Sequence, residues 1–178
     1  MNEAQKILPV VMHLLKGKAV LDLGCGDQKI VPWALGVDSG KEWAKPPEGV
    51  DIFAYVDPGA RELAQTLAAD GKPATYDVVF SSHTLEHMRA PILETLEYWV
   101  TFVSPGGVLV LYLPDERYYV YDRKNPRARN PAHKHLLTLD TFMWYVEQLQ
   151  GITIDQYSLD VVENDFERYS FLVVLRKA

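Results

Sequence analysis

Apolar residues follow two alternating patterns along this chain. In residues 7–15 they recur every three or four positions and give way to Lys16-Gly17, which predicts an opening helix. Short apolar runs follow, each ending at a polar residue or a glycine-containing turn, as buried parallel strands do. These runs predict strands at residues 19–21, 34–37, 51–56, 76–80 and 108–113.

Helical spacing returns between and after these runs. The predicted helices are residues 61–69, residues 90–103, closed by a turn at 104–107, and a late helix beginning near Thr138. The last two apolar runs, 152–157 and 169–175, are separated only by a loop and predict an antiparallel hairpin. Strands alternating with helices indicate an α/β fold with a mainly parallel sheet, whose ligands bind beyond the carboxyl ends of the strands.

Composition narrows the class of protein. A chain of 178 residues suits one domain, which we expect to span residues 1–178. The net charge of −6 opposes binding to nucleic acid, because that affinity comes mainly from Lys and Arg. Pro9 and His13 interrupt the first apolar run, so neither a signal peptide nor a membrane span is expected. The single cysteine, Cys25, excludes an internal disulfide and favours a cytoplasmic location.

Four motifs in a fixed order carry a resemblance to a known family. They are VLDLGCG at 20–26, GVD at 36–38, YDVVFSSHTLEH at 76–87 and SPGGVL at 104–109; HLLTLD at 135–140 is similar to the segment that opens a late helix. Together they resemble the class I S-adenosylmethionine (SAM)-dependent methyltransferases, type 11-like, over about residues 18–175. The resemblance implies a Rossmann-like three-layer sandwich with a seven-stranded sheet, SAM as cofactor, and methyl transfer to a small or medium-sized acceptor.

The motifs also indicate where the cofactor would lie. Gly24 and Gly26 lack a Cβ atom, so their backbone can turn sharply and approach the methionine part of SAM. Asp38 ends a strand, where a carboxylate can accept both ribose hydroxyls. The family pattern directs Asp22 toward the cofactor's ammonium group and places Asp57 beside adenine. The implied cofactor-binding residues are Asp22, Gly24, Cys25, Gly26, Asp38, Ser39, Asp57 and Ser81.

One segment departs from the family pattern. Only residues 27–35 separate Gly26 from Gly36, whereas a helical crossover between parallel strands usually needs about a dozen residues or more. Pro32 also resists a helix interior, so we expect the first crossover helix to be shortened to a turn. Loop amides or an ordered water would then hold the cofactor carboxylate. A catalytically inert SAM-binding or partner-binding protein of the same fold is therefore the alternative function.

Histidines are the candidate catalytic groups, because the imidazole titrates near neutral pH. His83 follows a strand end beside the expected methyl position, and His135 arrives on the late loop; these two are the catalytic candidates. The segment 117–134 is rich in tyrosine and basic residues, and suits a lid over an anionic acceptor, a solvated loop or a homo-oligomer contact. The candidate substrate-binding residues are His87, Tyr118, Arg123 and His133.

A second reading of one motif leads to another enzyme class. The string His83-Thr84-Leu85-Glu86-His87 fits the H-x-x-E-H pattern of zinc hydrolases. It directly follows a predicted strand, however, which puts His83 at or before the start of any helix and separates it from the helix face of His87. We therefore expect no metal, and rank a zinc hydrolase below the methyltransferase. A nicotinamide enzyme ranks lower still, because the third glycine of its fingerprint is missing.

Overall fold

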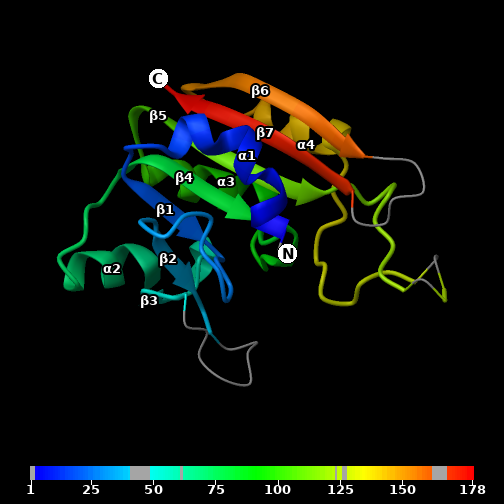
Figure 1. Ribbon diagram of the computed structural model, residues 1–178, viewed down its shortest axis with the longest axis horizontal. Coiled ribbons are helices and arrows are strands. Elements are labelled where there is room, and N and C mark those ends of the chain that lie inside the picture. Colours follow the sequence, from blue (N-terminus) through cyan, green and yellow to red (C-terminus); the bar gives the residue numbers. More distant parts are fainter. Residues whose placement is uncertain (1–2, 41–48, 61, 123, 126–127, 162–167) are drawn as a thin grey trace.

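The computed structural model describes residues 3–40, 49–60, 62–122, 124–125, 128–161 and 168–178. Its centre is a seven-stranded sheet in the order β3-β2-β1-β4-β5-β7-β6 (Figure 1). The strands are β1 Val20–Leu23, β2 Leu35–Asp38, β3 Ile52–Phe53, β4 Tyr76–Ser82, β5 Val103–Pro114, β6 Ile152–Val161 and β7 Tyr169–Lys177. Strands β1 to β5 pair in parallel, and β7 pairs antiparallel with both β5 and β6. The expected mainly parallel sheet with an antiparallel C-terminal hairpin is confirmed.

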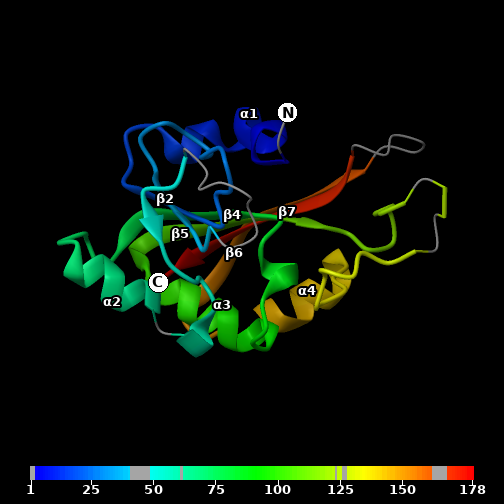
Figure 2. The same cartoon turned by 90° about the horizontal axis from the view of Figure 1, so that it is seen from below.

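Helices cover both faces of this sheet, as Figure 2 shows. The helices are α1 Glu3–Leu15, α2 Glu62–Ala69, α3 Ile92–Thr101 and α4 Leu139–Val146, with single 3₁₀ turns η1 Pro58–Ala60 and η2 Leu85–His87. Helix α1 lies on one face and the other three α-helices lie on the opposite face. Alternate residues of each strand feed the two cores: Val78 and Phe80 of β4 pack on the α1 side, while Val79 packs on the other. The three-layer sandwich is therefore confirmed.

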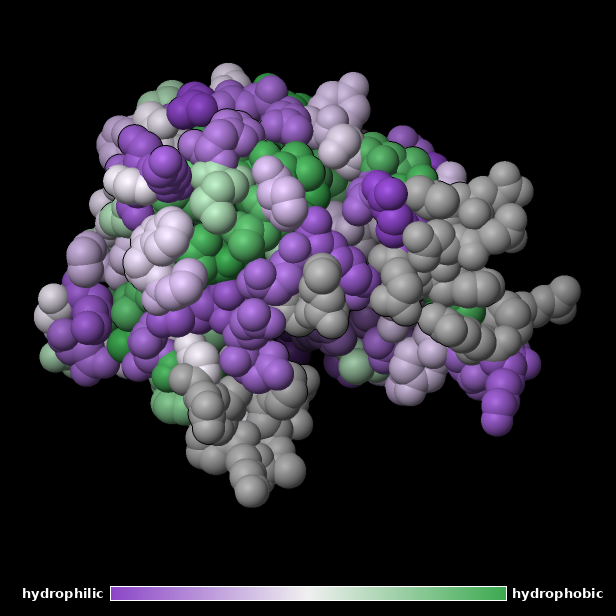
Figure 3. All heavy atoms as spheres, viewed as in Figure 1, coloured by the Kyte–Doolittle hydropathy of each residue, from purple (hydrophilic) through white to green (hydrophobic). Residues whose placement is uncertain are grey.

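The first crossover is short, as the sequence predicts. Residues 24–34 contain no helix, and Ile30, Val31 and Ala34 from this loop share a core with the apolar side of α1. Figure 3 shows the same face, where apolar residues gather toward the middle and polar residues surround them. The buried carboxylate of Asp22 fixes the loop, because its Oδ2 accepts a hydrogen bond of 2.6 Å from the backbone N–H of Ile30. Helix α1 and this loop thus provide the layer on that side.

One local expectation is wrong. The predicted turn at residues 104–107 lies within β5, which begins at Val103. Pairing runs from Tyr76–Val103 to Val78–Val108, so the extra residues of β5 form a bulge rather than a separate turn. Gly106 allows this bulge because its φ of 74° lies in the left-handed region. Among the described residues, no helix is both long enough and apolar enough to cross a bilayer.

Candidate functional site

A cavity of about 760 Å³ opens at the carboxyl ends of β1, β2 and β4. This is the edge where open parallel sheets bind ligands, and the volume lies in the range of small-molecule sites. Loops after each of these strands contribute to the wall. The lining residues are Gly24, Gly26, Asp38, Ser39, Tyr55, Val56, Asp57, Gly59, His83, Thr84, His87, Met88, Arg89, Ala90 and Glu94.

Gly24 lets two of these loops touch. Its φ is 72°, and a Cβ atom on it would lie 2.1 Å from Oγ1 of Thr84, in the loop after β4. The backbone N–H groups of Gly24 and Cys25 both donate to the carbonyl of Val37 in β2, at 2.8 and 3.1 Å. The turn after β1 is therefore held against both neighbouring strands. A side chain larger than hydrogen has no room at position 24.

Two aspartates brace the cavity wall. Asp38 accepts hydrogen bonds from the N–H groups of Gly26, at 3.1 Å, and Gly40, at 2.9 Å. Its oxygens each keep a second lone pair, so the carboxylate retains capacity for a sugar hydroxyl. Asp57 accepts from the N–H of Arg89 at 2.8 Å and thereby joins the segment after β3 to the segment after β4. Ser39 also lines the cavity, next to Asp38.

Three other residues of the predicted cofactor set lie behind the cavity wall. Asp22, Cys25 and Ser81 are buried and are not among the lining residues. The hydroxyl of Ser81 donates to the carbonyl of Leu23 at 2.9 Å, and burial raises the pKa of the Cys25 thiol. Cys25 therefore packs as a core residue. Direct contact of these three side chains with a cofactor stays a prediction.

Asp22 is expected to make the stability of the fold depend on pH. Burial raises the pKa of its carboxyl from 3.8 to about 7, although the bond from Ile30 works in the opposite direction. Between about pH 4 and pH 7 the unfolded chain therefore ionises while the folded chain keeps the proton, so stability falls as the pH rises through this window. At about 1.4 kcal/mol for each pKa unit, the loss is on the order of 4 kcal/mol at most.

Asp22→Asn is expected to remove this dependence, because the amide oxygen can still accept from Ile30 and does not ionise. Urea unfolding of both proteins at several pH values checks this. The stability of the variant relative to wild type should rise with pH and level off above about pH 7. Parallel stability curves for the two proteins would show that Asp22 does not carry the effect.

His83 lines the cavity in an unusual backbone conformation. Its φ is 50°, in the left-handed region that residues with side chains seldom occupy. The ring packs against Tyr112 and Tyr169, and its Nε2 lies 3.0 Å from the hydroxyl of Ser170. Burial lowers the pKa of His83 to about 3, and electrostatic interactions with His133 and Lys6 act in the same direction. The surrounding packing therefore fixes both the position and the neutral form of this imidazole.

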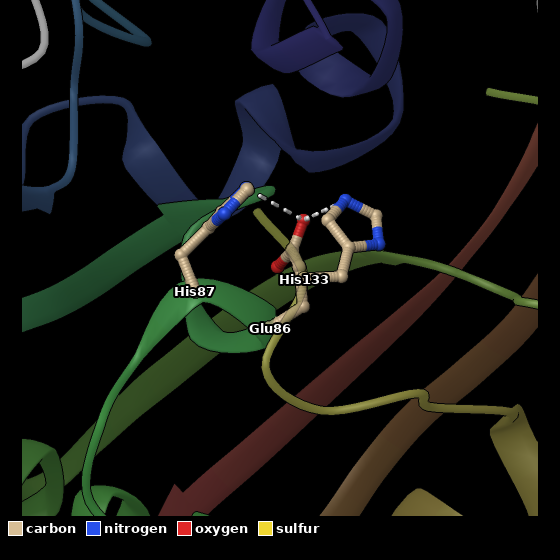
Figure 4. A group of neighbouring side chains, drawn as sticks. All are labelled: Glu86, His87 and His133. Atoms are coloured by element: carbon tan, nitrogen blue, oxygen red, sulfur yellow. Dashed lines mark ion pairs between the residues drawn. The ribbon is translucent and has the colours of Figure 1, made fainter. Parts of the chain in front are cut away.

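Sequence reasoning gave no role to Glu86, yet three histidines surround its buried side chain. Its Oε1 lies 3.7 Å from Nδ1 of His83, 3.7 Å from Nε2 of His87 and 4.0 Å from Nε2 of His133. Figure 4 shows Glu86 between His87 and His133. Burial raises the pKa of Glu86 to about 8. The H-x-x-E-H string was the available signal for this residue, although its neighbour His133 lies outside that string.

The late loop closes onto this cluster. The backbone carbonyl of Glu86 accepts from the N–H groups of Lys134 and His135, at 2.7 and 3.1 Å. The side chain of His133 is only 3% exposed and stacks on Tyr119, with ring centroids 4.9 Å apart. Nε2 of His135 lies 3.0 Å from the carbonyl oxygen of Ala90. The solvated-loop interpretation of segment 117–134 is therefore wrong at His133.

The remaining predicted residues either do not line the cavity or lie outside the described residues. Tyr118 is 43% exposed and carries the guanidinium of Arg117 over its ring. Arg123 lies outside the described residues. His135 does not line the cavity, and its catalytic role stays a prediction. The segment Leu85–His87 is a 3₁₀ turn, so His83 and His87 do not share the helix face that the zinc-hydrolase pattern requires.

The sheet order, the cavity at the strand ends and Asp38 at the end of β2 define a Rossmann-like α/β protein of the class I methyltransferase type. The sequence pattern of the methyltransferase domain family matches residues 3–171, and the chain belongs to that family.

Relatives and solved structures agree with this assignment. A ubiquinone biosynthesis O-methyltransferase from Aliivibrio fischeri is 35% identical over 104 residues, 52% of this chain and 42% of that protein. A tRNA U34 carboxymethyltransferase from Hydrogenovibrio crunogenus is 31% identical over 120 residues, 54% of this chain and 32% of that protein. The matches thus span less than half the length of either relative.

The fold is shared with solved SAM-dependent methyltransferases. One from Mesorhizobium loti has a TM-score of 0.65 at 17% identity and covers 99% of both chains. A 1,6-didemethyltoxoflavin-N1-methyltransferase from Burkholderia thailandensis, solved with bound 1,6-didemethyltoxoflavin and S-adenosylhomocysteine, has a TM-score of 0.61 at 17% identity, covering 98% of this chain and 76% of that one.

Proposed function

We propose that this chain is a SAM-dependent methyltransferase acting on a small or medium-sized acceptor. The observation that carries the proposal is a single cavity that joins the turn at Gly24 and Gly26 and the carboxylate of Asp38 to the histidine end at His83 and His87. Bound SAM would supply a methyl group that its sulfonium already activates. The protein then has to align the acceptor and exclude water.

Each wall of the cavity has a proposed task. The backbone at Gly24 and Gly26 approaches the methionine part of the cofactor, and Asp38 receives the ribose hydroxyls. Asp57 lies on the wall assigned to adenine. His83 faces the acceptor, held in place by Ser170. With the first crossover reduced to a loop, backbone amides of residues 24–34 hold the cofactor's carboxylate in place of a helix N-terminus.

The acceptor is expected to be an oxygen nucleophile rather than a strong anion. Among the described lining residues not assigned to the cofactor, Glu94 is acidic and Arg89 is basic, so the cavity has no excess of positive charge to favour the anionic acceptor considered from the sequence. The relative named as an O-methyltransferase supports an oxygen acceptor. We propose a phenol-like or alcohol-like hydroxyl as the acceptor group, and a single domain as the unit that carries out the transfer.

Calorimetric titration with SAM tests the cofactor site. Asp38→Ala removes the acceptor of the ribose hydroxyls and releases Gly26, so we expect SAM affinity to fall by about 10- to 100-fold. Asp70→Ala removes an exposed carboxylate after α2, away from the lining residues, and should bind SAM as wild type does. Absence of SAM binding by wild type at millimolar concentration would overturn the proposal.

Transfer of labelled methyl groups from SAM to a panel of small phenols and alcohols then tests catalysis. Incorporation of label that Asp38→Ala reduces in step with its lost affinity supports a methyltransferase. SAM binding without transfer to any member of the panel would favour the inert SAM-binding protein instead.

A further inference from the structure

The Glu86 cluster has the composition and spacing of a metal centre. The candidate ligand atoms of Glu86, His87 and His133 all lie within 4.8 Å of one another (Figure 4). We propose that these three residues bind one divalent transition-metal ion, such as Zn²⁺ or Co²⁺, at the histidine end of the cavity. Two imidazoles and a carboxylate are a donor set that suits such ions. This proposal departs from the sequence-based expectation of no metal.

The carboxylate of Glu86 is the first argument for a bound cation. It is 0% exposed, and neither oxygen has a hydrogen-bond partner among the described residues. Buried polar groups without partners are rare because losing water costs them free energy. The surrounding histidine nitrogens stand 3.7 to 4.0 Å from Oε1, which is too far for hydrogen bonds. A cation among these atoms would supply the missing partner.

The distances suit an ion after a small contraction. In a tetrahedral site with metal–ligand bonds of about 2.0–2.1 Å, neighbouring ligand atoms are separated by about 3.4 Å. The distances from Glu86 Oε1 to the nitrogens of His87 and His133 exceed this value by a few tenths of an ångström. The side chain of His87 is 28% exposed, so its ring has room to rotate toward the carboxylate of Glu86.

Each histidine is also oriented as metal ligands usually are, with its second ring nitrogen bonded to another group. Nδ1 of His133 lies 2.6 Å from Oε1 of Glu116, and Nδ1 of His87 lies 3.1 Å from the carbonyl oxygen of Ala132. A carbonyl oxygen only accepts hydrogen bonds, so Nδ1 of His87 carries the proton and Nε2 presents its lone pair toward Glu86. Glu116 likewise accepts a hydrogen bond from Nδ1 of His133, so Nε2 of His133 faces Glu86. The donor atoms are thus prepared before any ion arrives.

The position gives the ion a specific use, and this step rests on the proposed function. His83 and His87 line the cavity, so a metal held beside them has one side open to the space where the acceptor lies. An ion held by three protein ligands keeps a coordination position for an outside oxygen. A hydroxyl-bearing acceptor would bind there in preference to an acceptor without an oxygen donor. The same ion would hold the late loop, through His133, against the turn that contains Glu86.

Binding of metal alone provides the test. Untagged full-length protein is treated with a chelator, dialysed and titrated with Co²⁺, whose visible absorption reports coordination, and with Zn²⁺ by calorimetry. We expect one equivalent of either ion to bind and to raise the Tm. Glu86→Gln and His133→Gln should each weaken binding by about tenfold or more. His13→Gln changes a histidine on α1 outside the cluster and should bind as wild type does.

Glu86→Gln is chosen because it preserves the shape of a side chain that has no described hydrogen bond to lose, and His133→Gln provides a second test if that variant does not fold. Absence of Co²⁺ absorption and of any Tm shift at about 1 mM metal, or equal binding by wild type and the folded variants, would overturn the proposal. SAM titration of the same preparations separates the two proposals: SAM binding without metal binding contradicts only the metal site, and metal binding without SAM binding contradicts only the methyltransferase.

Discussion

Gly24→Ala is expected to weaken SAM binding by at least about tenfold, and to destabilise the fold more than alanine at an unobstructed left-handed glycine. The new Cβ would stand 2.1 Å from Oγ1, 2.4 Å from Cγ2 and 2.8 Å from Cβ of Thr84. Rotation of Thr84 cannot move its own Cβ, so the loops after β1 and β4 must separate. Because both loops line the cavity, the separation changes the shape of the cofactor site.

Gly106→Ala is the matched control. Gly106 has a φ of 74°, close to the 72° of Gly24, but a Cβ on it would meet nothing within 4 Å. Both substitutions incur the left-handed cost of about 1–2 kcal/mol, and only Gly24→Ala adds an overpacking cost of about 1–3 kcal/mol. Urea unfolding measures the difference in stability, and calorimetry measures a loss of SAM affinity of at least about tenfold. Adding Thr84→Ala to Gly24→Ala should partly restore the stability and the SAM affinity of the protein. Equal destabilisation by Gly24→Ala and Gly106→Ala, together with an unchanged SAM affinity of Gly24→Ala, would contradict the close contact between Gly24 and Thr84.

The sequence predicts well those features that depend on local pattern. The turn at Gly24 lies at the cavity because a buried apolar run and a glycine pair together place it at a strand end. Asp38 follows from the same logic on β2. The shortened crossover needs only a residue count and Pro32. In each case the residues that determine the feature are near neighbours in the chain, so their spacing and backbone chemistry are enough to predict it.

Contacts between the strand-end turn and the late loop could not be predicted in this way. Glu86 and His133 lie together because the carbonyl of Glu86 accepts hydrogen bonds from two backbone N–H groups of the loop. Every residue type other than proline has such an N–H group, so the sequence does not indicate which ones form these bonds. The loop also lacks a repeating pattern that would show which tyrosine points inward. Residue type alone favoured Tyr118, which is exposed, whereas the adjacent Tyr119 stacks on His133.

The hydrogen bonds that hold the beginning of the same loop could not be predicted from the sequence either. Asp115 is fully buried at the end of β5 and accepts hydrogen bonds from Nε and Nη2 of Arg117 and from the N–H of Leu139. It therefore joins the beginning of the loop to the first turn of α4. These bonds hold the pKa of Asp115 below its usual value. Arg117, considered from the sequence as a group for an anionic acceptor, is instead engaged in this internal ion pair.

Trp99→Ala should cause a large loss of stability, and Trp99→Phe a selective loss of cofactor affinity. Trp99 is fully buried in α3, and its Nε1 donates a 2.8 Å hydrogen bond to the carbonyl of Val56. Alanine at this position leaves a cavity in the core, with an expected cost of about 3–5 kcal/mol. Phenylalanine fills most of the volume but leaves the Val56 carbonyl without its donor, at about 1–3 kcal/mol.

The hydrogen bond connects this core residue to the site, because Val56 and its neighbour Asp57 line the cavity. Trp99→Phe should therefore fold and yet bind SAM several-fold more weakly. Trp144, which is 59% exposed on α4, is the control: Trp144→Ala should change stability by no more than about 0.5 kcal/mol and leave SAM affinity unchanged. Urea unfolding and calorimetry on the three variants measure both effects. If Trp99→Phe binds SAM as tightly as wild type, the wall at Val56 and Asp57 does not depend on the indole, and Trp99 serves the core alone.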